Sequence, residues 1–211
     1  TIGTRGNATG DVVLQREVEF NTDDESGAAG TIRVDGKFYY QNSASILITG
    51  HGTFEVNSAS LGGDALVRVA NGATLKFITS DAMLSKGDFT FEGGSTLVLP
   101  AAGSGAVALG GNVGFAGEGT VAVKLGDGTE IADGTYELLR VAGAIDNSYE
   151  SRFRLVNDTE SESLLLAMGD KLLLVVGGYA GGEYIWTGAA GDGKIGTAGN
   201  WLGNEAPVTG G

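Results

Sequence analysis

The chain has 211 residues, of which 38 are glycine, 2 are proline and none is cysteine. This length suits one domain or a capped solenoid, and the lack of cysteine excludes disulfides, thiolate metal sites and a cysteine nucleophile. The 26 acidic residues outnumber the 13 basic ones, and the net charge of −13 disfavours nucleic acid and anionic membrane surfaces as partners.

No segment of the sequence predicts a membrane-spanning helix. The longest strongly apolar stretch, residues 164–176, is interrupted by Gly169, Asp170 and Lys171, so it is too short and too polar to cross a bilayer. The chain begins at Thr1 without a methionine, a basic start or an apolar signal region. We therefore expect a processed or excised piece of a longer protein, with any export signal outside this sequence.

The first predicted strand covers residues 18–20 and leads into an outward loop over residues 21–30. Thr31 follows this loop and precedes a second strand over residues 32–34. From residue 46 onward the arrangement becomes regular: an apolar-x-apolar strand, five residues ending in threonine, and another apolar-x-apolar strand. Glycines between the two strands of each copy permit the positive φ of a sharp corner. The four copies cover residues 46–56, 67–77, 89–99 and 113–123.

The threonines that close the corners define the period of the repeat. They recur about every 22 residues, the length of one solenoid coil, and they are Thr31, Thr53, Thr74, Thr96 and Thr120. A third segment after each copy ends in leucine and a turn, and these segments are residues 61–64, 84–88 and 109–112. The sequence therefore predicts an all-β fold: a right-handed parallel β-helix over residues 11–125, with about 22 residues and three short strands per coil.

Alternation along each short strand predicts which side chains face the core. The first and third residues of a strand point inward, so the middle residue points outward. The outward residues of successive coils are Arg33, Glu55, Lys76, Val98 and Ala122. We expect the first three to form a ladder of alternating charge along the solenoid.

After residue 125 the repeat fades. Residues 126–178 contain longer apolar strands separated by Asp-Gly, Asn-Asp and Gly-Asp turns. They are predicted to form a C-terminal β cap over the end of the solenoid. Residues 179–211 are glycine-rich and carry the isolated Trp186 and Trp201, and they are predicted to be a linker or the start of a further unit.

Several of these segments together carry a resemblance to a known family. They are the Gly-x-Gly-Thr-apolar-x-apolar coils, Gly-Thr-Tyr-Glu-Leu-Leu at residues 134–139, Phe-Arg-Leu-Val at residues 153–156, and Gly-Asp-Lys-Leu-Leu-Leu from Gly169. In them the chain resembles autotransporter-type passenger proteins that carry autotransporter-associated β-strand repeats. Residues 186–201 look like the opening of another such repeat, although the tryptophan commonly found near Ile195 is missing.

The resemblance implies export beyond the inner membrane and display or release at the cell surface, with outer-membrane association in the full-length protein. Adhesion or scaffolding is the usual role in this family. The implied partners are proteins or glycans on the surface of a host or a neighbouring cell. The resemblance supplies no catalytic residue and no cofactor, and it leaves the oligomeric state open.

One enzyme hypothesis starts from the corner residues Asp64 and Asp88, which are expected at equivalent places in adjacent coils, with Asn112 next. Two carboxylates about 5 Å apart would suit a retaining glycosidase. Asp, Asn and Gly also favour turns for local reasons, so a structural role for these corners is the preferred interpretation. A glycoside cleft would need aromatic platforms, for which Tyr39 and Tyr40 are the nearest candidates.

Three further hypotheses concern the threonines, the histidine and the acidic loops. A threonine array can order water, but the mixed outward residues argue against an ice-binding face, and a threonine that begins a strand also suits β geometry. His51, the sole histidine, is expected to be an exposed turn residue. Two acidic groups could hold calcium, but neither has the spacing of an EF-hand or a glycine-rich nonapeptide repeat, so solvated loops are the preferred interpretation and a metal site stays open. The groups are Asp23 with Asp24 and Glu25, and Asp158 with Glu160 and Glu162.

The sequence thus favours a non-enzymatic, exported or surface-displayed passenger module that acts as a structural scaffold or adhesin. It predicts no catalytic residue and no cofactor. The alternative is a carbohydrate-active β-helix that binds or cleaves a polysaccharide, and an ice-binding solenoid is the minor alternative.

Overall fold

The computed structural model describes residues 12–14, 16–35, 38–40, 44–57, 63–126, 131–146, 152–156, 163–176 and 186–201. These residues form strands and turns, together with one short 3-10 helix, η1, at Ala198–Asn200. The strands of the solenoid are β1 Val12–Leu14, β2 Glu17–Asn21, β3 Thr31–Val34, β4 Phe38–Tyr40, β5 Ser45–Thr49, β6 Thr53–Val56, β7 Leu66–Val69, β8 Thr74–Phe77, β9 Phe89–Glu92, β10 Thr96–Leu99, β11 Val107–Leu109, β12 Val113–Ala116, β13 Val121–Leu125, β14 Gly134–Val141 and β15 Phe153–Leu155. They are followed by β16 Ser163–Met168 and β17 Lys171–Val176.

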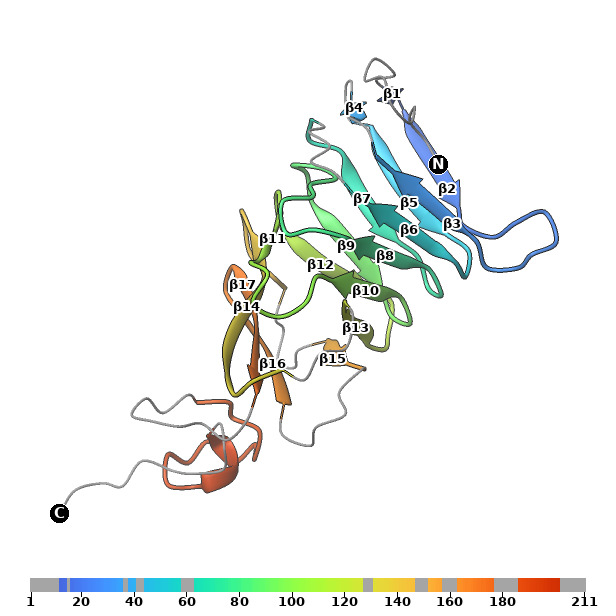
Figure 1. Ribbon diagram of the computed structural model, residues 1–211. Coiled ribbons are helices and arrows are strands. Elements are labelled where there is room, and N and C mark those ends of the chain that lie inside the picture. Colours follow the sequence, from blue (N-terminus) through green and yellow to red (C-terminus); the bar gives the residue numbers. More distant parts are fainter. Residues whose placement is uncertain are drawn as a thin grey trace.

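Two parallel sheets form the body of the molecule (Figure 1). One contains β2, β5, β7, β9 and β12 in this order, and the other contains β3, β6, β8, β10, β13 and β15. Because the chain moves from one sheet to the other in each coil, the strands stack into a β-solenoid. The predicted all-β parallel β-helix is therefore confirmed.

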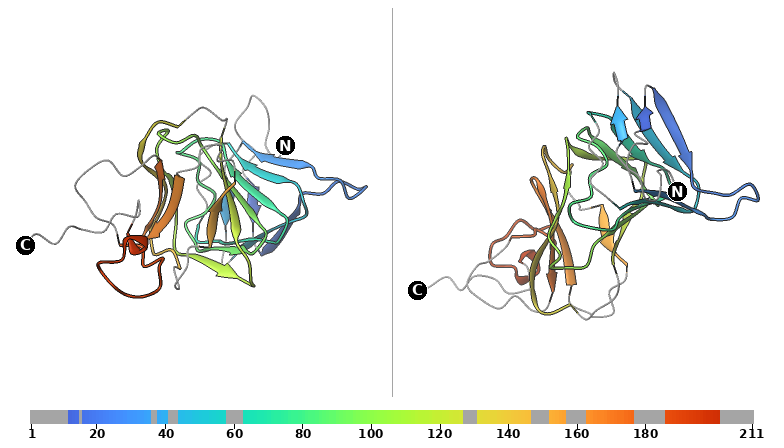
Figure 2. Two further views of the ribbon diagram at one scale, coloured as in Figure 1. Left: turned by 90° about the horizontal axis from the view of Figure 1, so that it is seen from below. Right: turned by 45° about the horizontal axis from the view of Figure 1, so that its top comes forward.

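The third side of the solenoid is less regular than the two sheets. At one end β1 pairs in parallel with β4, and at the other β11 pairs in parallel with β14. Between β8 and β9 this side consists of turns around Leu84, whose side chain is fully buried. The loop over residues 21–30 projects from the sheets, as the sequence predicted (Figure 2).

The threonine column runs through four coils. Thr31, Thr53, Thr74 and Thr96 are successive partners in the parallel sheet. The prediction for Thr120 is wrong, because Ala122 is the partner of Thr96. The corner that follows β12 is two residues longer than the corner that follows β9, so the next strand enters the sheet two residues later.

Arg152 holds this longer corner in place from the following coil. Its guanidinium donates hydrogen bonds to the carbonyl oxygens of Gly117, at 2.9 Å, and of Gly119, at 2.7 Å. It also lies 5.3 Å from the ring centroid of Phe115, a cation–π distance. The carbonyl groups that the extended corner turns away from the sheet are thereby satisfied by a charged donor.

The inward side chains of successive coils form one continuous core. Ile48, Val69, Phe91 and Phe115 are aligned in register in the five-stranded sheet, and the first three are fully buried. At the C-terminal end Phe153 packs edge-on against Phe91 and Phe115, with ring centroids 6.2 Å and 5.1 Å away. A single coil could not bury these side chains, so the core depends on stacking.

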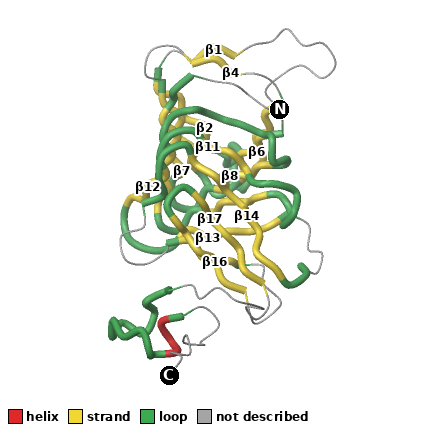
Figure 3. Tube along the Cα trace, turned by 90° about the vertical axis from the view of Figure 1, so that its left-hand side faces the viewer, coloured by secondary structure: helices red, strands yellow, loops and turns green. Residues whose placement is uncertain are grey.

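The parallel arrangement continues beyond residue 125. β14 pairs with β11, Ile145 bridges Val113, and β15 pairs with β13, all in parallel. One more coil therefore precedes the hairpin of β16 and β17, which adds to β14 in antiparallel orientation. The segment predicted as a cap combines this last coil with the hairpin, and the hairpin lies toward the end of the stack opposite β1 and β4 (Figure 3).

The hairpin is joined to β14 by a charge cluster whose ionisation should make stability depend on pH. Arg140 donates to both carboxylate oxygens of Glu137, at 2.6 and 2.8 Å, and the Lys171 ammonium lies 3.3 Å from one of them. The hydrogen bonds from Arg140, followed by those from Lys171, lower the pKa of Glu137 from 4.5 to about 2. The folded state therefore favours the ionised carboxylate more than the unfolded state does.

We expect this contribution to be present in full above pH 4.5 and to be lost as the pH falls toward 2. Replacing Glu137 with glutamine should lower the free energy of unfolding at neutral pH by about 1 kcal/mol and make this part of the pH dependence disappear. Thermal unfolding of both proteins between neutral pH and pH 2 measures the difference. A constant gap between them over that range would contradict the prediction.

The C-terminal segment described, residues 186–201, closes on itself. Trp186 and Trp201 form an antiparallel bridge, and their rings meet edge to face with centroids 5.1 Å apart. The fully buried Asn200 amide donates to the carbonyl oxygen of Lys194 and accepts from the backbone N–H of Ala190. It also donates to Asp192. The buried Asn200 side chain thus links three points of this segment. The two tryptophans in the sequence did not predict this hydrogen-bond network.

Candidate functional site

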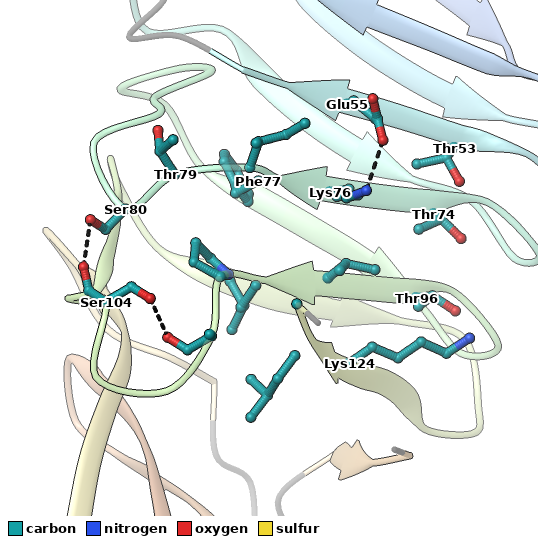
Figure 4. A pocket seen from close by; sticks show the side chains of 17 residues that line it. Thr53, Glu55, Thr74, Lys76, Phe77, Thr79, Ser80, Thr96, Ser104 and Lys124 are labelled. Carbon is teal, nitrogen blue, oxygen red and sulfur yellow. Dashed lines mark hydrogen bonds and ion pairs between the residues drawn. The ribbon is translucent and has the colours of Figure 1, made fainter. Parts of the chain in front are cut away.

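A hollow lies on the outer face of the six-stranded sheet, over β6, β8, β10 and β13 (Figure 4). We call it the sheet groove. Its volume is about 780 Å³. Three columns of side chains form its floor, and each column runs across the strands along the solenoid axis, because the strands are in parallel register.

The first column consists of the hydroxyl groups of Thr53, Thr74 and Thr96, which are half-buried at the start of their strands. Their spacing is that of neighbouring strands, about 4.8 Å. The flanking residues are charged or apolar, as the sequence predicted, so the face is not a uniform lattice of hydroxyl groups.

The second column contains the outward middle residues. Arg33, Glu55 and Lys76 are in register, as predicted. The Nζ atom of Lys76 lies 2.9 Å from the Oε1 atom of Glu55, so the two side chains form an ion pair. Arg33 binds Asp35 within its own coil, at 2.9 Å. Val98 follows Lys76, but the partner of Val98 is Lys124.

The sequence predicted Ala122 in that place of the second column. The longer corner after β12 shifts the strand by two residues and brings Lys124 into the column instead. The second column therefore has charged residues at both of its ends, and the apolar Val98 lies between them.

The third column and a loop form the apolar side and the wall of the groove. Ile78 and Pro100 follow the ends of β8 and β10, and the loop that contains Ser104 rises beside them (Figure 4). Ser80 donates a hydrogen bond to the carbonyl oxygen of Ser104, at 2.9 Å, and the Ser104 hydroxyl donates to that of Ala101, at 2.7 Å. The first bond ties the turns of two adjacent coils into one wall, and the second lies within the turn of Ser104.

The described lining of the sheet groove contains more basic than acidic side chains. Glu55 is the only acidic side chain among the described residues of its lining, and it is paired with Lys76. Lys124 is exposed and has no ion-pair partner in the part of the chain that the structure describes. Among the described residues, the positive charge at the C-terminal end of the groove is therefore not paired with an acidic side chain, although the whole chain has a net charge of −13.

The structure does not bring Asp64 and Asp88 to equivalent corners. Val67 is the partner of Phe89, so the residue next to Asp88 in the preceding coil is Leu66, and Asp64 lies two positions earlier. The prediction of equivalent positions is wrong because the spacing from aspartate to strand differs between the two coils.

Asp88 instead holds a turn. One of its carboxylate oxygens accepts hydrogen bonds from the backbone N–H of Asn112, at 2.6 Å, and from the Asn112 amide, at 3.1 Å. The amide oxygen of Asn112 accepts in turn from the backbone N–H of Ala144. Each corner residue thus satisfies the backbone of the next coil, in agreement with the structural interpretation.

His51 is an exposed turn residue, as predicted, with 77% of its side chain accessible. The sequence did not reveal its partner: Asp23 accepts from the backbone N–H of His51 at 2.7 Å and lies 3.0 Å from its ring Nδ1. The backbone hydrogen bond from His51 is the main cause that lowers the pKa of Asp23. Asp24 accepts from Ser26 and Ala28 within the same loop. Both carboxylates therefore serve the turn.

Within the described residues no group of three or more His, Cys, Asp or Glu side chains is placed to hold a metal ion. Asp158, Glu160 and Glu162 lie outside these residues. Tyr39 and Tyr40 belong to β4, whose side chains are also outside the description. Asp64 and Asp88 therefore do not form the carboxylate pair that the enzyme hypothesis named.

None of the helical residues in the described part of the chain forms a segment long and apolar enough to cross a membrane. Comparison with family models, with curated proteins and with solved structures gives no match.

Proposed function

We propose that this chain is a non-enzymatic, exported or surface-displayed passenger module that acts as a structural scaffold or adhesin. The observation that carries the proposal is the use of polar side chains at the corners of the solenoid. Asp88, Asn112, Asp23 and Asp24 all accept hydrogen bonds from nearby backbone, so each of them stabilises a turn. Such an arrangement suits an extended module that presents its faces to a partner.

The proposal also draws on the family resemblance described above, which concerns the repeat, the cap segments and residues 186–201. A stack of coils presents long side faces and two ends, and each face can bind a partner without a deep cleft. The carbohydrate-active alternative requires acidic groups free to exchange protons with a substrate. The one acidic side chain in the described lining of the sheet groove is instead paired with a lysine.

Labelling of intact source cells with an antibody against the chain tests its display. We expect labelling without permeabilisation, and labelling only after permeabilisation would contradict an exported module. Beads coated with the folded chain should retain cells or surface extracts more strongly than beads coated with the heat-unfolded chain. Incubation with neutral and acidic polysaccharides should produce no new reducing ends or unsaturated ends, and the appearance of either would favour the enzyme instead.

A further inference from the structure

We propose that the sheet groove binds a short, otherwise neutral glycan that carries one carboxylate, such as an oligosaccharide with a single uronic or sialic acid residue. This inference rests on the proposed adhesive function and assigns a ligand class to one face of the solenoid. The evidence is the order of hydroxyl, charged and apolar columns in the groove, together with the Lys124 ammonium group at its C-terminal end, which has no ion-pair partner among the described residues.

The chemistry of the groove floor matches that of a sugar chain. A pyranose ring has hydroxyl groups at its edge and C–H groups on its faces, so it needs polar and apolar contacts side by side. The threonine column supplies hydroxyl groups along one side, and Val98, Ile78 and Pro100 supply apolar surface beside it. The four strands of the floor extend over roughly 14 Å, which accommodates a short run of linked rings.

The position of Lys124 determines which kind of glycan is favoured. Its side chain extends along the sheet below Thr96, on the threonine side of the groove (Figure 4). A carboxylate at one end of the ligand can form an ion pair there, while the rings before it lie over the neutral middle of the floor. The net charge of −13 disfavours a densely charged polyanion, because long-range repulsion grows with the charge of the ligand.

A peptide ligand is disfavoured by the hydrogen bonding of the sheet. Peptides that add a strand need an unpaired sheet edge. The groove instead lies on a sheet face, where β8 and β10 are paired on both sides with neighbouring strands. Recognition here must therefore come from side chains, which suits a ligand with many hydroxyl groups.

The test uses the whole chain and a panel of oligosaccharides that carry one uronic or sialic acid residue. Each is paired with its neutral counterpart, and a heparin oligosaccharide represents the polyanions. Binding is measured by calorimetry, and the contact surface is mapped by amide chemical shifts. The groove variants are Lys124→Gln, which removes the charge, and Thr74→Val, which removes a hydroxyl group at nearly constant volume. The matched controls are Lys86→Gln, at an exposed turn, and Thr90→Val, on the outer face of the other sheet.

We expect at least one acidic oligosaccharide to bind about tenfold more tightly than its neutral counterpart. Shifts should concentrate on β8, β10 and β13, Lys124→Gln should remove the preference for the acidic ligand, and Thr74→Val should weaken both ligands. The controls should bind as the unchanged chain does, and circular dichroism should show all four variants folded. Binding that does not respond to Lys124→Gln, or that is strongest for heparin, would overturn the inference.

Two further outcomes separate this inference from the proposed function. If no oligosaccharide of the panel binds while coated beads still retain cells, the glycan assignment fails and the adhesive function stands. If an oligosaccharide binds and is cleaved, the non-enzymatic function fails, although the location of the ligand in the groove can still be read from the shifts.

Discussion

Replacing Gly93 with alanine is expected to lower the free energy of unfolding by about 3 kcal/mol. A Cβ atom at this position would lie 1.7 Å from the carbonyl oxygen of Glu118 in the next coil, which is far inside the contact distance. The obstructing atom belongs to backbone, and Arg152 holds the carbonyl groups on both sides of it. The corner therefore cannot move aside without losing these charged hydrogen bonds. Urea unfolding followed by circular dichroism measures the loss.

The matched control for this variant is Gly114→Ala. A Cβ atom there would meet nothing within 4 Å, and the backbone does not have positive φ. The free energy of unfolding should stay unchanged or rise by about 0.5–1 kcal/mol, because alanine restricts the unfolded chain. Equal destabilisation by both substitutions would show that the contact between Gly93 and the next corner does not limit the packing of the coils.

Truncation of Phe91 to alanine should cost about 3–5 kcal/mol of unfolding free energy. The side chain is fully buried, and it lies between Val69 and Phe115 in the inward column of the five-stranded sheet. The same ring also contacts Phe153 edge to face. Its removal leaves a cavity that is bordered by the side chains of the preceding and the following coil. The backbones of the stacked coils cannot move together to fill this cavity.

Leu66→Ala is the matched control for this truncation, because Leu66 lies in the neighbouring strand with 45% of its surface exposed. Its effect on the free energy of unfolding should stay within about 0.5 kcal/mol. Denaturant unfolding of the two variants under the same conditions provides the comparison. A loss below about 1 kcal/mol for Phe91→Ala would contradict the proposed cavity.

The parallel β-helix could be predicted from the sequence because its physical cause is periodic. Inward residues such as Ile46, Val67 and Phe89 recur at nearly the coil length, and the same spacing places their strands in register. A repeat of this kind leaves few alternatives, since each coil buries its apolar side only against a similar coil. Fold class and the charge order of Arg33, Glu55 and Lys76 followed from that constraint.

The register at the corners was less predictable, because a loop can gain residues without changing the alternation of the strands that it joins. The two extra residues before Ala122 kept inward and outward faces intact, so the apolar pattern still agreed with a shorter corner. The prediction that Asp64 and Asp88 occupy equivalent corners was wrong for the same reason, because the number of residues between the aspartate and the next strand differs between the two coils. Only a partner from a later coil, Arg152, reveals how the extended corner is supported.

The sheet groove could not be predicted from the sequence either. Its columns come from four coils, and its wall depends on a hydrogen bond between Ser80 and Ser104, which are distant in the chain. Lys124 entered the groove through the two-residue shift that the repeat pattern did not show. The segment between β10 and β13, which begins at Pro100, is longer than the corresponding segments of the preceding coils. Its length was the available signal that this coil contains extra residues.

Stacking in one dimension also has a consequence for how the molecule opens. Within each parallel sheet a coil pairs only with the coil before it and the coil after it. Amide hydrogens of β7, β8 and β9 are therefore expected to exchange with solvent most slowly, since opening must proceed inward from an end to reach them. Fraying of the outermost coils can then occur while the middle stays folded, so that one side face remains available to a partner when an end is pulled or cleaved.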